Sequence, residues 1–128
     1  MVDVIIDTSV LVEHLRGRPL LNRVEEIVGD AVVAMAHPVC VAELVEGARN
    51  AAEPRDVEDL CGAMRFVECA SVDLAHGISS LKRLRLRHGL DWHDCVIATT
   101  AVRLCVPVAT RNYKHFRLFA GLRIVRLP

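Results

Sequence analysis

The chain has 128 residues, of which 52% are hydrophobic and 25% are charged, and 16 basic and 16 acidic residues give a formal net charge of zero. This composition suits one domain with a full core, excludes general disorder, and leaves nucleic-acid binding to a local basic patch. The apolar runs are shorter than the roughly 18 residues of a membrane span, and no secretion signal is recognisable. The five cysteines are odd in number, which argues against a disulfide framework. We therefore expect a cytoplasmic protein with one domain over residues 1–128 and no membrane partner.

In chain order, the expected elements alternate between short strands and longer helices. β-Branched and apolar runs predict strands at Val4–Ile6, Ala31–Ala36, Phe66–Ala70, Val106–Ala109 and Arg123–Leu127. Capping residues, glycines and prolines predict helices over Val10–Arg16, Pro19–Gly29, Pro38 to about Asn50, from Glu53, Val72–Gly89 and Asp91–Leu104. Strands separated by helices pair in parallel, so the sequence predicts a three-layer α/β/α domain around a parallel sheet of about five strands.

In such a sheet, ligands bind beyond the carboxyl ends of the strands. Asp7 directly follows the first strand, where a carboxylate is costly unless it has a task. Its simpler task is to cap the next helix, although Thr8 and Ser9 could cap it equally well. The fourth strand is followed by three polar residues that either orient water or phosphate or form a plain turn: Thr110, Arg111 and Asn112.

Two further acidic residues lie on predicted helices. Glu43 has small neighbours at helical spacing, so a ligand or another backbone could approach it closely, but an ordinary surface glutamate is the simpler explanation. Asp94 lies in the first turn of a helix that is apolar nearly all round. The helix dipole alone could explain a carboxylate there, and Asp91 competes for that explanation.

Together, these residues form one ordered pattern that resembles the PIN-domain ribonucleases, and among them the VapC-type toxins of bacterial toxin–antitoxin pairs. The resemblance covers nearly the whole chain. The segments that carry it are Ile5-Ile6-Asp7-Thr8-Ser9, Ala42-Glu43-Leu44-Val45-Glu46-Gly47, Asp94-Cys95-Val96-Ile97-Ala98-Thr99-Thr100-Ala101 and Thr110-Arg111-Asn112-Tyr113-Lys114-His115-Phe116.

The resemblance implies a toxin that acts as an Mg²⁺-dependent endoribonuclease, in which a metal-activated water cleaves RNA phosphodiester bonds and Mn²⁺ can substitute for Mg²⁺. Asp7, Glu43 and Asp94 would be the catalytic carboxylates. A hard divalent cation removes the repulsion between carboxylates gathered in one cleft. We expect Asp7 and Asp94 to be the main metal ligands and Glu43 to bind through water or to position the nucleophile.

The chain departs from the family at one point. Many members carry a fourth acid after the fourth strand, where this chain has Asn112 and His115. With three carboxylates we expect one well-occupied metal ion in the free enzyme, unless Asp91 completes a second site. Thr8, Asp91, Thr110 and Asn112 are the candidate supporting residues.

Contacts with RNA are expected from two basic runs. The candidates are Arg111 and Lys114 beside the acidic pattern, and Lys82 and Arg85 within a run that is otherwise a solvated helix face. Phe66, Phe116 and Phe119 are expected in the core, so base stacking would not dominate recognition.

The resemblance also implies a cognate VapB-type antitoxin and a homodimer. Two alternatives stay open: a degenerate PIN domain that binds RNA or a partner without catalysis, and a receiver-type phospho-switch domain. The receiver needs an acidic pair after the first strand and an aspartate that ends the third. Here Thr8-Ser9 and Ala70-Ser71 stand at those places, which disfavours it.

Overall fold

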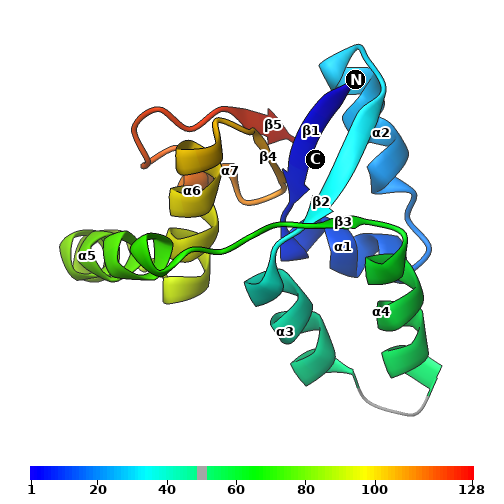
Figure 1. The fold of residues 1–128 in the computed structure, drawn as a ribbon, viewed down its shortest axis with the longest axis horizontal. Helices are drawn as coiled ribbons and strands as arrows, with labels where there is room; N and C mark the ends of the chain where they lie inside the picture. The colour runs from blue at the N-terminus through cyan, green and yellow to red at the C-terminus, as the bar shows by residue number, and fades with distance from the viewer. Residues whose placement is uncertain (49–51) are drawn as a thin grey trace.

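The computed structural model describes residues 1–48 and 52–128 (Figure 1). The strands of this part are β1 (Val2–Ile6), β2 (Val32–Ala36), β3 (Arg65–Phe66), β4 (Val108–Thr110) and β5 (Ile124–Arg126). They form one five-stranded sheet of order β3-β2-β1-β4-β5, in which every neighbouring pair is parallel. The described helices are α1 (Thr8–Leu15), α2 (Leu20–Val28), α3 (Pro38–Gly47), α4 (Ala52–Gly62), α5 (Ser71–His88), α6 (Trp92–Leu104) and α7 (Tyr113–Phe116).

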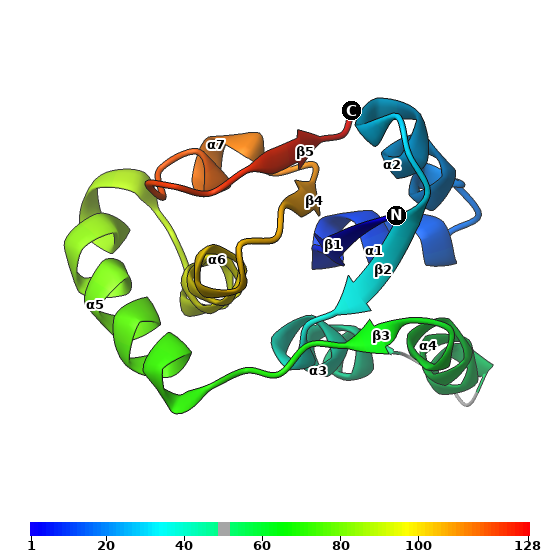
Figure 2. The same cartoon turned by 45° about the horizontal axis from the view of Figure 1, so that its top comes forward.

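Helices lie on both sides of the sheet (Figure 2), which confirms the predicted three-layer α/β/α architecture. β1 is the central strand, and Val4, Ile5 and Ile6 are fully buried because both edges pair and both faces are covered. A continuous β-branched run is therefore the sequence that this position requires. In the described residues no helix is long and apolar enough to cross a bilayer.

The two longest helices, α5 and α6, form a close pair at one end of the molecule (Figure 1). Gly77 makes this approach possible, since a Cβ atom there would stand 2.9 Å from Val96 Cγ2. α5 packs mainly on α6 and lies outermost, whereas α6 is buried along most of its length. The sequence of α6 is apolar nearly all round because the helix is buried inside the fold.

The structure corrects three predictions. The strand expected at Phe66–Ala70 is only Arg65–Phe66, because this edge strand has just Met35 and Ala36 opposite it, and after Val67 the chain leaves the sheet for α5. Phe66 lies on that edge and is 56% exposed, so its assignment to the core was wrong, whereas Phe116 is fully buried. The short helix α7 was not predicted.

The expected end of the third helix, about Asn50, lies outside the described residues; α3 ends at Gly47.

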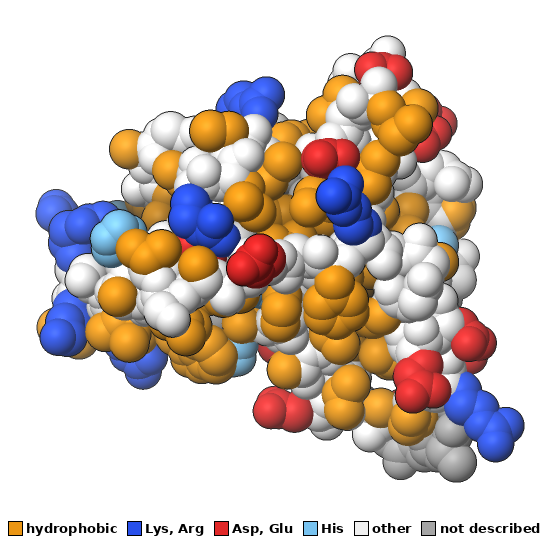
Figure 3. Space-filling view, viewed as in Figure 1, with side chains coloured by type: hydrophobic (Ala, Val, Ile, Leu, Met, Phe, Trp, Pro, Cys, Tyr) orange, Lys and Arg blue, Asp and Glu red, His pale blue; other side chains and the backbone are white. Residues whose placement is uncertain are grey.

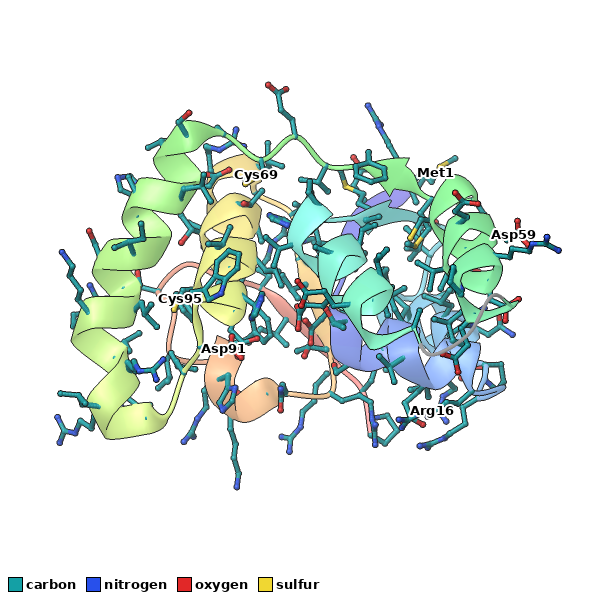
Figure 4. All side chains as sticks on the ribbon, turned by 90° about the horizontal axis from the view of Figure 1, so that it is seen from below. Met1, Arg16, Asp59, Cys69, Asp91 and Cys95 are labelled. Carbon is teal, nitrogen blue, oxygen red and sulfur yellow. The ribbon has the colours of Figure 1, made fainter. Side chains whose placement is uncertain are left out.

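Parallel pairing decides which side chains meet at the carboxyl edge of the sheet. Asp7 follows β1, and Thr110 ends the neighbouring strand β4. α6 precedes β4 and connects to its start, so the first turn of α6, with Asp94, lies at the same edge. Figure 4 looks onto this edge and shows Asp91 at the start of α6 beside α7, with Arg16 at the far end of α1. The topology therefore gathers acids that are distant in the sequence.

Candidate active site

Asp7 directly follows β1 and is a buried residue, 3% exposed. It occupies the N-cap position of α1, but its side chain makes no capping hydrogen bond. Instead, Asp7 Oδ2 accepts hydrogen bonds from Ser9 Oγ at 2.7 Å and Thr110 Oγ1 at 2.8 Å. Burial raises the pKa of Asp7, and the hydroxyl hydrogen bonds act against this. Helix capping, the simpler explanation for this residue, does not account for its contacts.

Glu43 reaches the edge from α3 and is half-buried. Its Oε1 accepts a hydrogen bond of 2.9 Å from Thr8 Oγ1, which ties α3 to the start of α1. Burial raises the pKa of Glu43; Thr8 and His93 lower it, and the charges of Asp7 and Asp91 raise it further. The glutamate therefore shares an electrostatic environment with Asp7 and is not an isolated surface residue.

Asp94 and Asp91 divide two tasks at the start of α6. Asp91 is the capping residue, because its Oδ1 accepts a hydrogen bond of 3.1 Å from Asp94 N. The side chain of Asp94 is thereby free of capping, and Asp94 Oδ2 lies 2.8 Å from His115 Nδ1. Burial raises the pKa of Asp94 to about 6, together with the negative charges of Asp91 and Asp7, while His115 opposes the shift.

Charge–charge repulsion between the acids contributes to these raised pKa values. Asp7 acts on both Glu43 and Asp94, and Asp91 acts on the same two residues. In the described part of the chain, no lysine or arginine forms an ion pair with Asp7, Glu43 or Asp94. The edge thus holds negative charge that no lysine or arginine of the described residues neutralises, and His115 is the titratable group that lies against Asp94.

The donor chemistry of this edge fits a hard divalent cation. All three carboxylates offer oxygen ligands, and Mg²⁺ keeps several waters while using only one or two protein carboxylates. Within residues 1–48 and 52–128, no three His, Cys, Asp or Glu side chains converge into a ready-made metal cluster. Asp7 and Asp94 are the residues that would hold the ion, with Glu43 beside them.

The candidate supporting residues differ in whether they contact the carboxylates directly. Thr8 and Thr110 donate directly to the carboxylates. Asn112 is exposed, and only its backbone N–H reaches the site, where it donates to Thr110 Oγ1 at 2.9 Å. Two site residues were missed as candidates, Ser9 and His115. The Asp7-x-Ser9 spacing could have indicated the first, whereas the contact of His115 with Asp94 has no local sequence signal.

The basic candidates separate into two groups. Lys82 and Arg85 lie on α5, at the end of the molecule where basic side chains gather in Figure 3. Because α6 lies between α5 and the sheet, these two residues are separated from the carboxylates. Lys114 is exposed on α7. Arg111 follows β4 immediately beside the site, and its backbone N–H donates to Ser9 Oγ at 3.0 Å.

The side chain of Arg111 turns away from the carboxylates toward Glu13, with Nη1 3.3 Å from Oε1. Arg16 and Arg18 pair with the same glutamate at 3.2 and 2.9 Å. Three guanidinium groups therefore surround one buried carboxylate at the far end of α1, which leaves a local excess of positive charge. Arg16 and Arg18 were not among the sequence candidates.

Comparison with known proteins shows the family to which the chain belongs. The PIN domain family matches residues 4–122. Ribonuclease VapC19 of Mycobacterium tuberculosis is 32% identical over 93% of this chain and 96% of its own length. Ribonuclease VapC10 of the same species is 31% identical over 94% of this chain and 90% of its own.

Among solved structures, VapBC-1 from nontypeable Haemophilus influenzae superposes with a TM-score of 0.77 at 20% identity, covering 97% of both chains. VapBC2 from Rickettsia felis, bound to a promoter DNA fragment, gives a TM-score of 0.76 at 15% identity and covers 98% of this chain and 99% of that one. These two likenesses concern the fold, and the sequence match over residues 4–122 concerns descent. The chain belongs to the PIN domain family.

Proposed function

We propose that this chain is a VapC-type toxin, a divalent-metal-dependent endoribonuclease that hydrolyses RNA phosphodiester bonds. The observation that carries the proposal is the group of carboxylates at the carboxyl edge of the sheet, Asp7, Glu43 and Asp94, whose pKa values are raised and which no Lys or Arg of the described chain neutralises. The names of the sequence relatives, both ribonucleases, support the choice of RNA as substrate.

Each carboxylate has a distinct part in this proposal. Asp7 and Asp94 would hold a magnesium ion, for which manganese can substitute, and the bound ion would supply positive charge at the scissile phosphate and acidify the attacking water. Glu43 Oε1 already accepts a hydrogen bond from Thr8, and Oε2 would accept a hydrogen bond from that water and orient it. Thr110 and Ser9 keep Asp7 in place while substrate binds.

RNA would approach over the cationic rim of the site. Lys114 is exposed on α7, the helix whose His115 contacts Asp94, and the arginines around Glu13 lie further along, at the far end of α1. Phosphate contacts from such side chains position a strand without reading its sequence. Lys82 and Arg85 stay candidates for a more distant part of the RNA.

The test is cleavage of end-labelled RNA by the purified protein in the presence of Mg²⁺ or Mn²⁺. Asp7→Asn should lower the rate by about a hundredfold or more, since even outer-shell partners of a metal contribute 10–100-fold. Asp59→Asn, the same substitution at an exposed aspartate of α4, is the matched control and should cleave normally. Unchanged cleavage by folded Asp7→Asn would refute the assignment; RNA binding without any cleavage would favour the degenerate PIN domain.

We also propose a VapB-type antitoxin as partner, because solved relatives are VapBC complexes. An arginine or lysine of the antitoxin would enter between Asp7 and Asp94, where it meets unneutralised carboxylates. A crystal structure of the complex tests this, and a carboxylate edge left open to solvent would contradict it. We further propose that the toxin is a homodimer. Light scattering at tens of micromolar, roughly the concentration at which a weak dimer still forms, should give the mass of a dimer, and the mass of a monomer would contradict this.

A further inference from the structure

His115 differs from the other partners of the carboxylates. Asp7 and Glu43 are held by hydroxyl groups, whereas Asp94 Oδ2 meets an imidazole nitrogen, His115 Nδ1, at 2.8 Å. In the part of the chain that the structure describes, this is the one side-chain hydrogen bond that Asp94 makes. The orientation of the Asp94 carboxylate therefore depends on His115.

The backbone that carries His115 is firmly anchored. Phe116, the next residue, is fully buried in the core. The guanidinium of Arg126 stacks over the ring of Tyr113, with 4.5 Å between Cζ and the ring centroid. His115 N donates to Asn112 O at 3.1 Å. A short helix held on both sides of the histidine places its ring with little freedom.

The same short segment also holds Asp7. Thr110 begins the segment and donates to Asp7 Oδ2, and Asn112 N donates back to Thr110 Oγ1. The chain from Thr110 to Phe116 thus contacts both expected metal ligands, one through each of its ends. A rigid segment that contacts both can fix the spacing between them.

A purely structural role explains this contact poorly. The start of α6 is already capped by Asp91, so the helix does not need His115 to satisfy its backbone. The His115 ring is 32% exposed, which means that its removal leaves no closed cavity in the core. What His115 contributes is a fixed direction for Asp94.

We propose that His115 is a positioning residue that donates its Nδ1–H to Asp94 Oδ2 and leaves Oδ1 directed at the divalent cation. This inference rests on the proposed function, since it concerns the metal site of that reaction. Outer-shell hydrogen bonds of this kind orient a ligand, and their loss lowers metal affinity by about 10–100-fold. His115 itself is not a ligand in this arrangement.

The experiment is a titration of the full chain with Mn²⁺, in which electron paramagnetic resonance measures the free ion and no RNA is present. His115→Leu keeps the bulk of the ring and removes the donor, so the dissociation constant should rise about tenfold. His115→Asn retains an N–H at the place of Nδ1 and should bind within about threefold of the unmodified protein. His88→Ala, at an exposed histidine of α5, is the control and should not change affinity.

Asp94→Asn supplies the second arm. If His115 acts through Asp94, adding His115→Leu to Asp94→Asn should produce no further loss of affinity. Equal weakening by Leu and Asn, no weakening by Leu, or additive losses in the double variant would each overturn the role of His115. Failure of the unmodified chain to bind Mn²⁺ would overturn the proposed function as well, so the two failures are distinguishable.

Discussion

Two groups of buried polar side chains show opposite electrostatic designs. In the interior, Asp73 is fully buried and receives two hydrogen bonds from Arg103, from Nε at 2.8 Å and from Nη2 at 2.9 Å. Burial acts to raise the pKa of Asp73, but Arg103 and the other donors outweigh it, so that the pKa lies below its usual value. At the carboxyl edge, Asp7 and Asp94 are buried, no lysine or arginine of the described residues pairs with them, and their pKa values are raised.

Buried acids thus fall into two kinds, which differ in whether an arginine accompanies the carboxylate. An acid with its own arginine is complete, and its task is to hold elements together: Arg103 also donates to Glu68 O and so ties α6 to the segment before α5. An acid held only by hydroxyls or an imidazole lacks a permanent counter-charge, which is the setting in which we propose that a cation from outside binds. Burial alone would not separate the two cases.

The largest effect that sharpens this comparison is expected at Arg103. Arg103→Ala leaves the buried carboxylate of Asp73 without its cation, which should lower the free energy of unfolding by more than any substitution of an exposed residue that makes no such contact. Chemical denaturation at pH 7 measures this loss. Arg117→Ala, at an exposed arginine after α7, is the control and should change stability by less than about 0.5 kcal/mol. A loss no larger than that of the control would mean that the interior pair does not stabilise the fold.

A second interior group, His37, predicts a pH dependence. His37 Nδ1 accepts from Val39 N, and Nε2 lies 3.0 Å from Thr100 Oγ1, so the buried ring is neutral. Burial lowers the pKa of His37 from 6.5 to about 4, although the charge of Asp73 opposes the shift. The unfolded chain then takes up the proton first, so this contribution to stability is complete above pH 6.5 and is lost as the pH falls toward 4.

The expected loss across this window is about 3 kcal/mol. His37→Asn retains a capping acceptor for Val39 N but cannot titrate, so its stability should vary less between pH 7 and pH 4. Denaturation curves at both pH values give the comparison. An equally steep loss in the variant would assign the pH dependence to other groups.

At the carboxyl edge, Asp94 predicts a pH dependence of stability opposite in sign to that of His37. The pKa of Asp94 is raised from 3.8 to about 6, so stability falls as the pH rises from 3.8 toward 6, and the full cost of the charged form is present above that window. Asp94→Asn should therefore stabilise the metal-free protein at pH 7, on the order of 2 kcal/mol. Added Mg²⁺ should raise the melting temperature of the unmodified protein and not that of the variant. Destabilisation by Asp94→Asn would show that its charge supports the fold, as that of Asp73 does.

The sequence predicted the centre of this fold well and its margins poorly. Val4–Ile6 is a β-branched run with a strand on each side, so local pattern and tertiary position agree. The strand expected at Phe66–Ala70 is short because only two residues of β2 lie opposite it. The length of an edge strand depends on its neighbour, so it could not be predicted from the residues of the strand itself. The four-residue helix α7 is too short to show a helical period.

The candidate site divides in the same way. Asp7, Glu43 and Asp94 stand in local motifs, so they could be named from the chain alone and remain a prediction as catalytic residues. The contact of His115 with Asp94 spans 21 residues, and those of Arg16 and Arg18 with Glu13 depend on how the end of α1 turns. The i,i+3 spacing of Glu13 and Arg16 could have indicated their pairing, whereas local spacing carries no information about the contact between His115 and Asp94, which only the packed structure brings together.

We expect the carboxyl edge to hold a divalent cation between Asp7 and Asp94. Anomalous scattering from crystals soaked in Mn²⁺ without RNA tests it most directly. With three carboxylates and a neutral Asn112 nearby, we predict one well-occupied ion contacting Asp7 and Asp94, and a second ion only when RNA phosphate is present. No ion at this edge would contradict the claim, and two ions of equal occupancy about 4 Å apart would contradict the one-ion account.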